Sequence, residues 1–146
     1  MNKVLLALAA LSITAAAPAP DGDVTVTVTG VKAKGGTLRV GLYTEPTFLR
    51  AAPPHMTSAP VSAAGDVTVT FHGVPKGDYA ATALHDADND NQITMGTDGR
   101  MAEGTALSRS EELKGMPTFD AAKIAVPASG ASIRIAMSYP EDRTGW

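Results

Sequence analysis

Residues 24–29 read Val-Thr-Val-Thr-Val-Thr, a strict alternation of apolar and polar side chains. Successive side chains of a β-strand point to opposite faces of the sheet, so this stretch places its three valines on one face and its three threonines on the other. The pattern predicts a strand that buries its valine face and leaves its threonine face open to water.

Five further segments continue this alternation, and turns rich in glycine or proline separate them. Gly35 and Gly36 follow the first strand, and paired glycines suit a hairpin because they adopt positive φ without a steric cost. Six short strands, with room for a seventh, predict an all-β fold: an antiparallel β-sandwich of about seven strands with one long acidic loop. The further segments are 38–42, 67–71, 78–85, 122–126 and 133–137.

Two stretches, 44–64 and 86–117, show no strand pattern and are expected as long connections. The first is apolar and contains four prolines, which suits a segment that covers a sheet edge. Within the second, residues 110–114 have the pattern of a short helical turn. Connections longer than about 12–15 residues inside a compact domain are usually functional or disordered. The second, acidic connection therefore holds the candidate site.

The composition excludes several classes of partner and site. The 146 residues suffice for one domain, and a net charge of −3 supplies no basic surface for nucleic acid or anionic lipid. The chain contains no cysteine, which excludes disulfides, thiolate metal sites and thiol nucleophiles. We therefore expect no nucleic-acid partner.

The first 19 residues have the features of a cleaved secretory signal. Lys3 precedes an apolar run at 4–11, and small residues that suit signal peptidase follow it. The run is shorter than the roughly 20 apolar residues of a membrane helix, so we expect no membrane insertion of the mature chain. Residues 20–140 are then expected to form a single β-sandwich domain and residues 141–146 a flexible tail. The expected location is periplasmic or secreted.

We call residues 86–103, at the start of the second connection, the acidic loop. It places oxygen-bearing side chains at alternate positions, which can point inward at one hard cation, as in calcium-binding loops. Asn91 stands where such loops place glycine, and asparagine is the non-glycine residue that best tolerates a left-handed backbone. Thr97 stands where a bidentate Glu is usual, and Asp98 follows it. With Ca²⁺ as the candidate cofactor, the candidate ligands are Asp86, Asp88, Asp90, the backbone carbonyl of Gln92, Thr94 and Asp98.

The charge of this loop favours a cation without requiring one. Residues 86–103 contain five acidic residues and one arginine, and carboxylates this close repel one another unless water or a cation separates them. A solvated acidic turn, held by bonds from side chains to the backbone, explains the same residues without a metal. Magnesium is rarely held by an all-protein cage, and transition metals prefer histidine, for which His85 has no partner histidine at ligand spacing.

Several motifs follow one another along the chain in an order that resembles a known bacterial family. They are the segments 26–30 and 38–43, the turn from Phe71 to Ala80, the loop that begins at His85-Asp86, the pair Glu103-Gly104 and the segment Gly115 to Ala122. Together they resemble the family known as domain of unknown function 2141, which consists of small exported proteins. The resemblance implies a transthyretin- or immunoglobulin-like β-sandwich and no particular reaction. The family typically carries Gly at the position of Asn91 and Asp at that of Thr94, so this chain departs from it twice.

Three functions remain open at this point. We favour an exported, non-enzymatic envelope module that binds an envelope protein or glycan and holds calcium in its acidic loop. The first alternative is an acid/base or metal-dependent hydrolase that uses the 86–103 loop with His85. The second is a purely structural assembly module without a metal, whose edge strands pair with a partner. The sequence contains no serine elbow, zincin helix or phosphate-binding glycine loop, which argues against the hydrolase.

Overall fold

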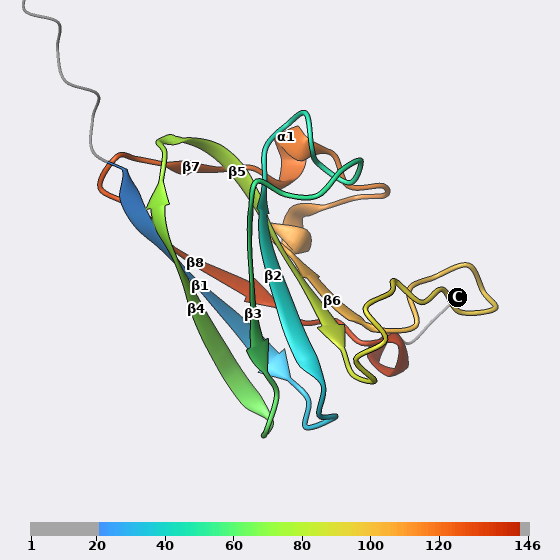
Figure 1. Cartoon of the computed structure of the whole chain (residues 1–146). Coiled ribbons are helices and arrows are strands. Elements are labelled where there is room, and N and C mark those ends of the chain that lie inside the picture. The colour runs from blue at the N-terminus through green and yellow to red at the C-terminus, as the bar shows by residue number, and fades with distance from the viewer. Residues whose placement is uncertain (1–20, 144–146) are drawn as a thin grey trace, which may run out of the picture.

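The structure is a computed structural model that describes residues 21–143, which form eight strands in two sheets packed face to face (Figure 1). The strand order is β4-β1-β8 in one sheet and β3-β2-β5-β6 in the other, where β7 also pairs with β5. The strands are β1 (Gly22–Val31), β2 (Thr37–Tyr43), β3 (His55–Pro60), β4 (Gly65–Val74), β5 (Gly77–Asp86), β6 (Gly104–Leu107), β7 (Ile124–Val126) and β8 (Ala131–Ala136). The helical turns are η1 (Ser110–Glu112), α1 (Phe119–Ala122) and η2 (Pro140–Asp142). The expected all-β sandwich is confirmed.

Strand β1 follows the predicted alternation. Val24, Val26 and Val28 are fully buried between the two sheets. Thr25 and Thr27 lie on the outer face, where their hydroxyls lie 3.4 and 3.2 Å from those of two threonines of β4. Because β1 is the middle strand of its sheet, its valines form the centre of the core.

The pairing of β1 with β8 is parallel, whereas the sequence led us to expect antiparallel strands throughout. Val24 lies opposite Ala131, and Thr29 lies opposite Ala136. Tight turns impose antiparallel pairing only on strands that follow one another, and most of the chain separates β1 from β8. Alternation identifies the buried face of a strand but carries no information about the direction of its neighbour.

Two strands lie inside the segments that were expected as connections, so that expectation was wrong. β3 is an edge strand whose residues alternate between half-buried and exposed, and no apolar stripe marks it in the sequence. β6 has four residues, too few for a recognisable pattern. Both form because β2 and β5 offer them backbone partners. The short turn expected at 110–114 is present as η1, and the strand expected from residue 122 begins later because Thr118 caps α1.

Strand β5 is buried on both faces and carries small side chains for that reason. Ala81 and Ala83 face the core between the sheets. Ala80 points the other way and packs against Phe48 and Ala122 in a second, smaller cluster. This cluster fixes α1 and the segment around Phe48 on the outer face of the β3-β2-β5-β6 sheet, the face turned away from the core.

A buried hydrogen-bond network joins the two sheets near the end of β5. His85 Nε2 lies 2.7 Å from the carbonyl oxygen of Gly35, which can only accept, so Nε2 carries the proton. His85 Nδ1 then accepts from the hydroxyl of Tyr139 at 2.8 Å, and that hydroxyl accepts from the backbone N–H of Lys32 at 2.9 Å. The Tyr139 ring packs so closely on Gly104 that a Cβ there would lie 2.3 Å from a ring carbon. Every polar atom of this network has a partner.

The C-terminal turn η2 is held against the turn between β1 and β2. Lys32 donates to Glu141 at 3.1 Å and to Asp142 at 2.7 Å, and Lys34 lies 2.6 Å from Glu141. The Lys34 contact, followed by a hydrogen bond from the Glu141 backbone and by the Lys32 contact, lowers the pKa of Glu141 to about 2. Residues 141 and 142 of the expected tail thus form exposed ion pairs with the sandwich, and residues 144–146 lie outside the described part.

The signal expected at 1–19 also lies outside the described residues. Within residues 21–143, no helix has the length and apolar character that crossing a membrane requires.

Replacing Tyr139 with Phe tests the buried network. We expect the free energy of unfolding to fall by about 1–3 kcal/mol, because the Lys32 N–H and His85 Nδ1 both lose their partner, and the bond between His85 and Tyr139 is buried. Tyr79→Phe is the control, since the Tyr79 hydroxyl donates to the Pro75 carbonyl at 3.0 Å in a partly buried turn. Urea unfolding measures both, and equal losses in the two variants would contradict the role given to Tyr139.

Candidate functional site

Asp86 occupies the last position of β5 and is fully buried on the outer face of its sheet. Arg39, on the neighbouring strand β2, donates from Nη2 to Asp86 Oδ2 at 2.8 Å and also to the side-chain oxygen of Asn91. Burial by itself would raise the pKa of Asp86, but the hydrogen bonds from Arg39 and from the backbone N–H groups of Asn91 and Asp90 outweigh burial and lower it. Asp86 is therefore an ionised group inside the fold.

The chain turns sharply after Asp86 because its side chain accepts from the backbone that follows. The N–H of Asp90 donates to Asp86 Oδ1 at 3.2 Å and to Asp88 Oδ1 at 3.1 Å, and the N–H of Asn91 donates to Asp86 Oδ2 at 3.2 Å. Asn89 and Asn91 adopt left-handed backbone angles, with φ of 58° and 62°. Asparagine accepts this conformation at low cost, as the sequence predicted for position 91.

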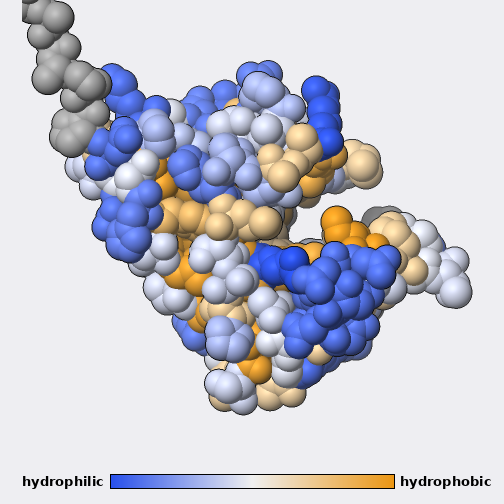
Figure 2. Space-filling model, in the orientation of Figure 1, coloured by the Kyte–Doolittle hydropathy of each residue, from blue (hydrophilic) through white to orange (hydrophobic). Residues whose placement is uncertain are grey.

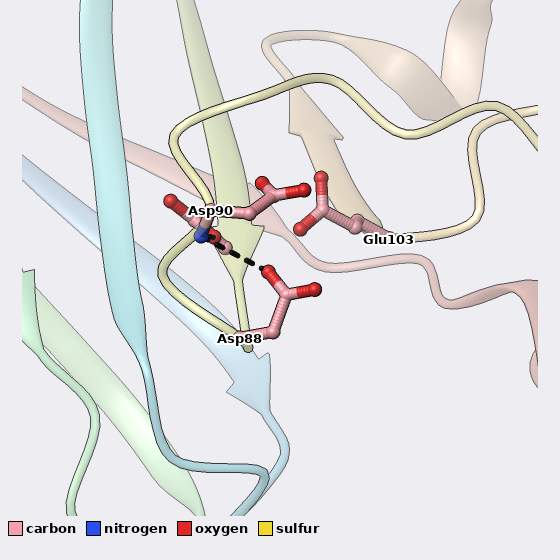
Figure 3. Close-up of side chains that lie close together, drawn as sticks. Asp88, Asp90 and Glu103 are labelled. Atoms are coloured by element: carbon pink, nitrogen blue, oxygen red, sulfur yellow. Dashed lines mark hydrogen bonds between the residues drawn. The ribbon is translucent and has the colours of Figure 1, made fainter.

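Four carboxylates converge where this turn meets the start of β6. Asp86, Asp88, Asp90 and Glu103 each place an oxygen within 4.8 Å of the others. Figure 3 shows the carboxylate of Glu103 facing that of Asp90, with Asp88 beside them on the same side of the loop. We call these four residues the acidic cluster.

Glu103 enters the cluster through strand pairing. Gly104 lies opposite His85 in the antiparallel β5–β6 pair, so the residue before Gly104 lies next to Asp86. Sequence reasoning left Glu103 out of the ligand set, because its distance along the chain does not fit a calcium loop. A prediction of β6 and of its register would have found it, but β6 is too short to recognise.

Glu103 lacks a partner for one of its oxygens. Its Oε2 is buried and forms no hydrogen bond with any described residue. Burial raises the pKa of Glu103, and the charges of Asp86, Asp90 and Asp88 add to the rise, while the backbone N–H of Thr94 opposes it. A buried carboxylate oxygen without a donor is costly, and either a proton or a cation would satisfy it.

The other predicted ligands have different places. The N–H of Gln92 donates to Asp90 Oδ1 at 2.8 Å, and the Thr94 hydroxyl lies 3.5 Å from Asp90 Oδ2, so both residues orient Asp90. Asp98 accepts from the backbone N–H of Arg100 at 3.0 Å in a separate turn and lies outside the acidic cluster. Of the four predicted carboxylate ligands, the structure therefore brings three together, and it adds Glu103.

No curated protein and no solved structure gives a significant match to this chain. One family model does match, over residues 26–134, and its description reads "Uncharacterized protein conserved in bacteria (DUF2141)". The match spans both sheets and the acidic cluster. The chain therefore belongs to the DUF2141 family of uncharacterised bacterial proteins.

Proposed function

We propose that this protein is an exported, non-enzymatic β-sandwich of the bacterial envelope that binds a calcium ion at the acidic cluster and presents the loop to a protein or glycan partner. The observation that carries the proposal is the convergence of Glu103 with the three loop aspartates, since a residue from a separate strand completes the cluster. Export rests on the signal-like features of the first 19 residues.

One carboxylate of the acidic cluster holds the loop in shape, and the other three are available to bind a cation. Both oxygens of Asp86 already accept hydrogen bonds, and the Arg39 guanidinium offsets its charge. Asp88 and Asp90 are exposed, and Glu103 has an unpartnered oxygen. These last three residues are the main donors that a cation would use.

Calcium suits this donor set better than other metals do. Calcium takes six to eight oxygen ligands in flexible geometry, so carboxylates on a surface turn, completed by water, can satisfy it. Magnesium demands a nearly ideal octahedron and rarely accepts a cage of protein ligands. The nearest histidine, His85, points to the opposite face of the sheet and has both ring nitrogens engaged, which leaves the cluster without a nitrogen ligand for a transition metal.

The same engagement of His85 argues against catalysis, because this histidine is not available as a base beside the carboxylates. One observation favours the alternative of an acid/base hydrolase: the raised pKa of Glu103 is a property of general acids. Substitution of Asp88 by Asn separates the two functions. Loss of a hydrolytic turnover with unchanged stability would favour the hydrolase, whereas loss of calcium-dependent stability favours our proposal.

Calcium is expected to stabilise the purified protein against heat. Extracellular calcium modules bind with dissociation constants of about 0.1–1 mM, so 10 mM calcium should add roughly 1.4–2.7 kcal/mol and raise the unfolding midpoint by several degrees relative to chelator. Thermal unfolding followed by circular dichroism measures the shift, with magnesium at the same concentration as the comparison.

Two variants, each of which removes one negative charge, test whether the calcium-induced rise in the unfolding midpoint comes from the acidic cluster. Asp90→Asn keeps the shape of the side chain and should remove most of the calcium effect. Asp98→Asn lies in the same loop but outside the cluster and should retain it. No calcium shift in the parent, or equal loss in both variants, would leave the acidic loop as a solvated turn and favour the metal-free assembly module.

Glu103→Gln should stabilise the protein in chelator at pH 7. The folded state raises the pKa of Glu103 above its ordinary value of 4.5, through burial first and the Asp86 charge second. Ionised Glu103 therefore destabilises the folded state, and this penalty grows as the pH rises from 4.5 through the folded pKa. The difference in unfolding free energy between variant and parent should be smallest near pH 4 and should grow as the pH rises through the folded pKa of Glu103. A variant less stable than the parent at pH 7 in chelator would contradict this assignment.

A further inference from the structure

The outer face of the β3-β2-β5-β6 sheet contains a groove of about 780 Å³. Its floor is formed by outward-facing residues of β2, β5 and β6, among them Gly41, Leu84 and Leu107. Its walls are the segment 49–53, the part of the acidic loop around Ile93, and the chain after η1. Figure 2 shows a notch on this side, between the lobe that carries α1 and the lobe that carries the acidic loop. The volume lies within the range typical of small-molecule sites.

The lining of the groove is apolar and unusually exposed. Leu49, Met56 and Ile93 line it, and 57%, 62% and 62% of their surfaces are accessible to solvent. They are three of the five large apolar side chains exposed in the described part of the chain. Gathered apolar side chains on a surface mark a binding site, whereas single ones scattered over it do not.

Leu49 is also strained. Its φ of 54° lies in the left-handed region, which a branched apolar residue rarely adopts. A glycine would satisfy this backbone without strain, so the fold holds an exposed leucine at the rim of the groove at a cost in stability. Strain of this kind is concentrated at functional positions.

The charges of the groove have one sign. Its charged lining residues are Arg39 and Arg50, and no acidic side chain lines it. The Nε of Arg39 is buried without a hydrogen-bond partner among residues 21–143. Asp86 offsets one of these two positive charges, so about one is left for a ligand. This balance suits a monoanion, such as a carboxylate, better than a phosphate dianion.

We infer that the groove binds a small amphipathic carboxylate, a molecule with one apolar chain and one carboxylate head. The chain lies along the apolar floor between Leu49, Met56 and Ile93, and the carboxylate lies at Arg50, the lining arginine that forms no ion pair among the described residues. The inference does not rest on calcium binding, since none of the four acidic-cluster residues lines the groove.

Isothermal titration calorimetry with dodecanoate tests the inference. The titration is made in chelator, which prevents calcium soaps, and below the concentration at which dodecanoate forms micelles. We expect saturable binding of one molecule per chain. Dodecyltrimethylammonium has the same chain with a cationic head and should bind at least about tenfold more weakly, because it meets the two arginines with like charge.

Matched charge reversals locate the head group. Arg50→Glu should weaken dodecanoate binding about tenfold or more. Lys76→Glu makes the same change in charge in the turn between β4 and β5, away from the groove, and should leave the affinity unchanged. Equal effects of the two variants, or equal affinity for the anionic and cationic probes, would overturn the inference.

Leu49→Gly distinguishes an effect on ligand binding in the groove from an effect on the stability of the fold. It relieves the strained backbone, so the thermal midpoint should stay the same or rise, while dodecanoate binding weakens several-fold. Unchanged affinity in a folded variant would overturn the inference. Sedimentation of the parent provides a final check, because a dimer that Arg50→Glu dissociates would assign the groove to a second copy of the chain instead.

Discussion

The hydrogen bond from Arg39 to Asp86 fixes the part of the molecule on which both proposed ligand sites depend. Asp86 ends a strand that is buried on both faces, and an ionised carboxylate there would be costly without the guanidinium beside it. Asp86 also accepts from two backbone N–H groups, which help to keep it charged, and these bonds turn the chain into the acidic loop. The same guanidinium lines the groove on the outer face of the sheet. One ion pair thus positions a strand end, a loop and a groove.

Arg39 also belongs to two neighbouring regions of opposite charge. It pairs with Asp86 of the acidic cluster, and it lines the groove, whose charged lining residues are both arginines. The ligands proposed for the two regions, a divalent cation and a carboxylate, have opposite signs. Each would reduce the electrostatic cost of placing the other, so their affinities would be linked through space without a change of conformation.

The sequence predicted the features that local patterns encode and missed those set by pairing between distant segments. Alternation found β1 and its buried face, and oxygen spacing brought Asp86, Asp88 and Asp90 together. It missed β3 and β6, whose residues carry no apolar stripe, and therefore missed Glu103, which only the register of β6 brings to the cluster. The sequence did not predict the groove for a related reason. Its floor comes from three strands, and each strand contributes only one or two apolar residues to it.

The parallel pairing of β1 with β8 has a consequence for how the chain reaches this fold. The first strand gains its second neighbour only from residues more than a hundred positions later, and contacts between segments so far apart along the chain slow folding. Before β8 pairs with β1, one edge of the valine-rich β1 has free backbone donors and acceptors. Such an edge is a template for pairing with other chains. The last strand therefore protects the first from aggregation, and a chain truncated before residue 131 would lack that protection.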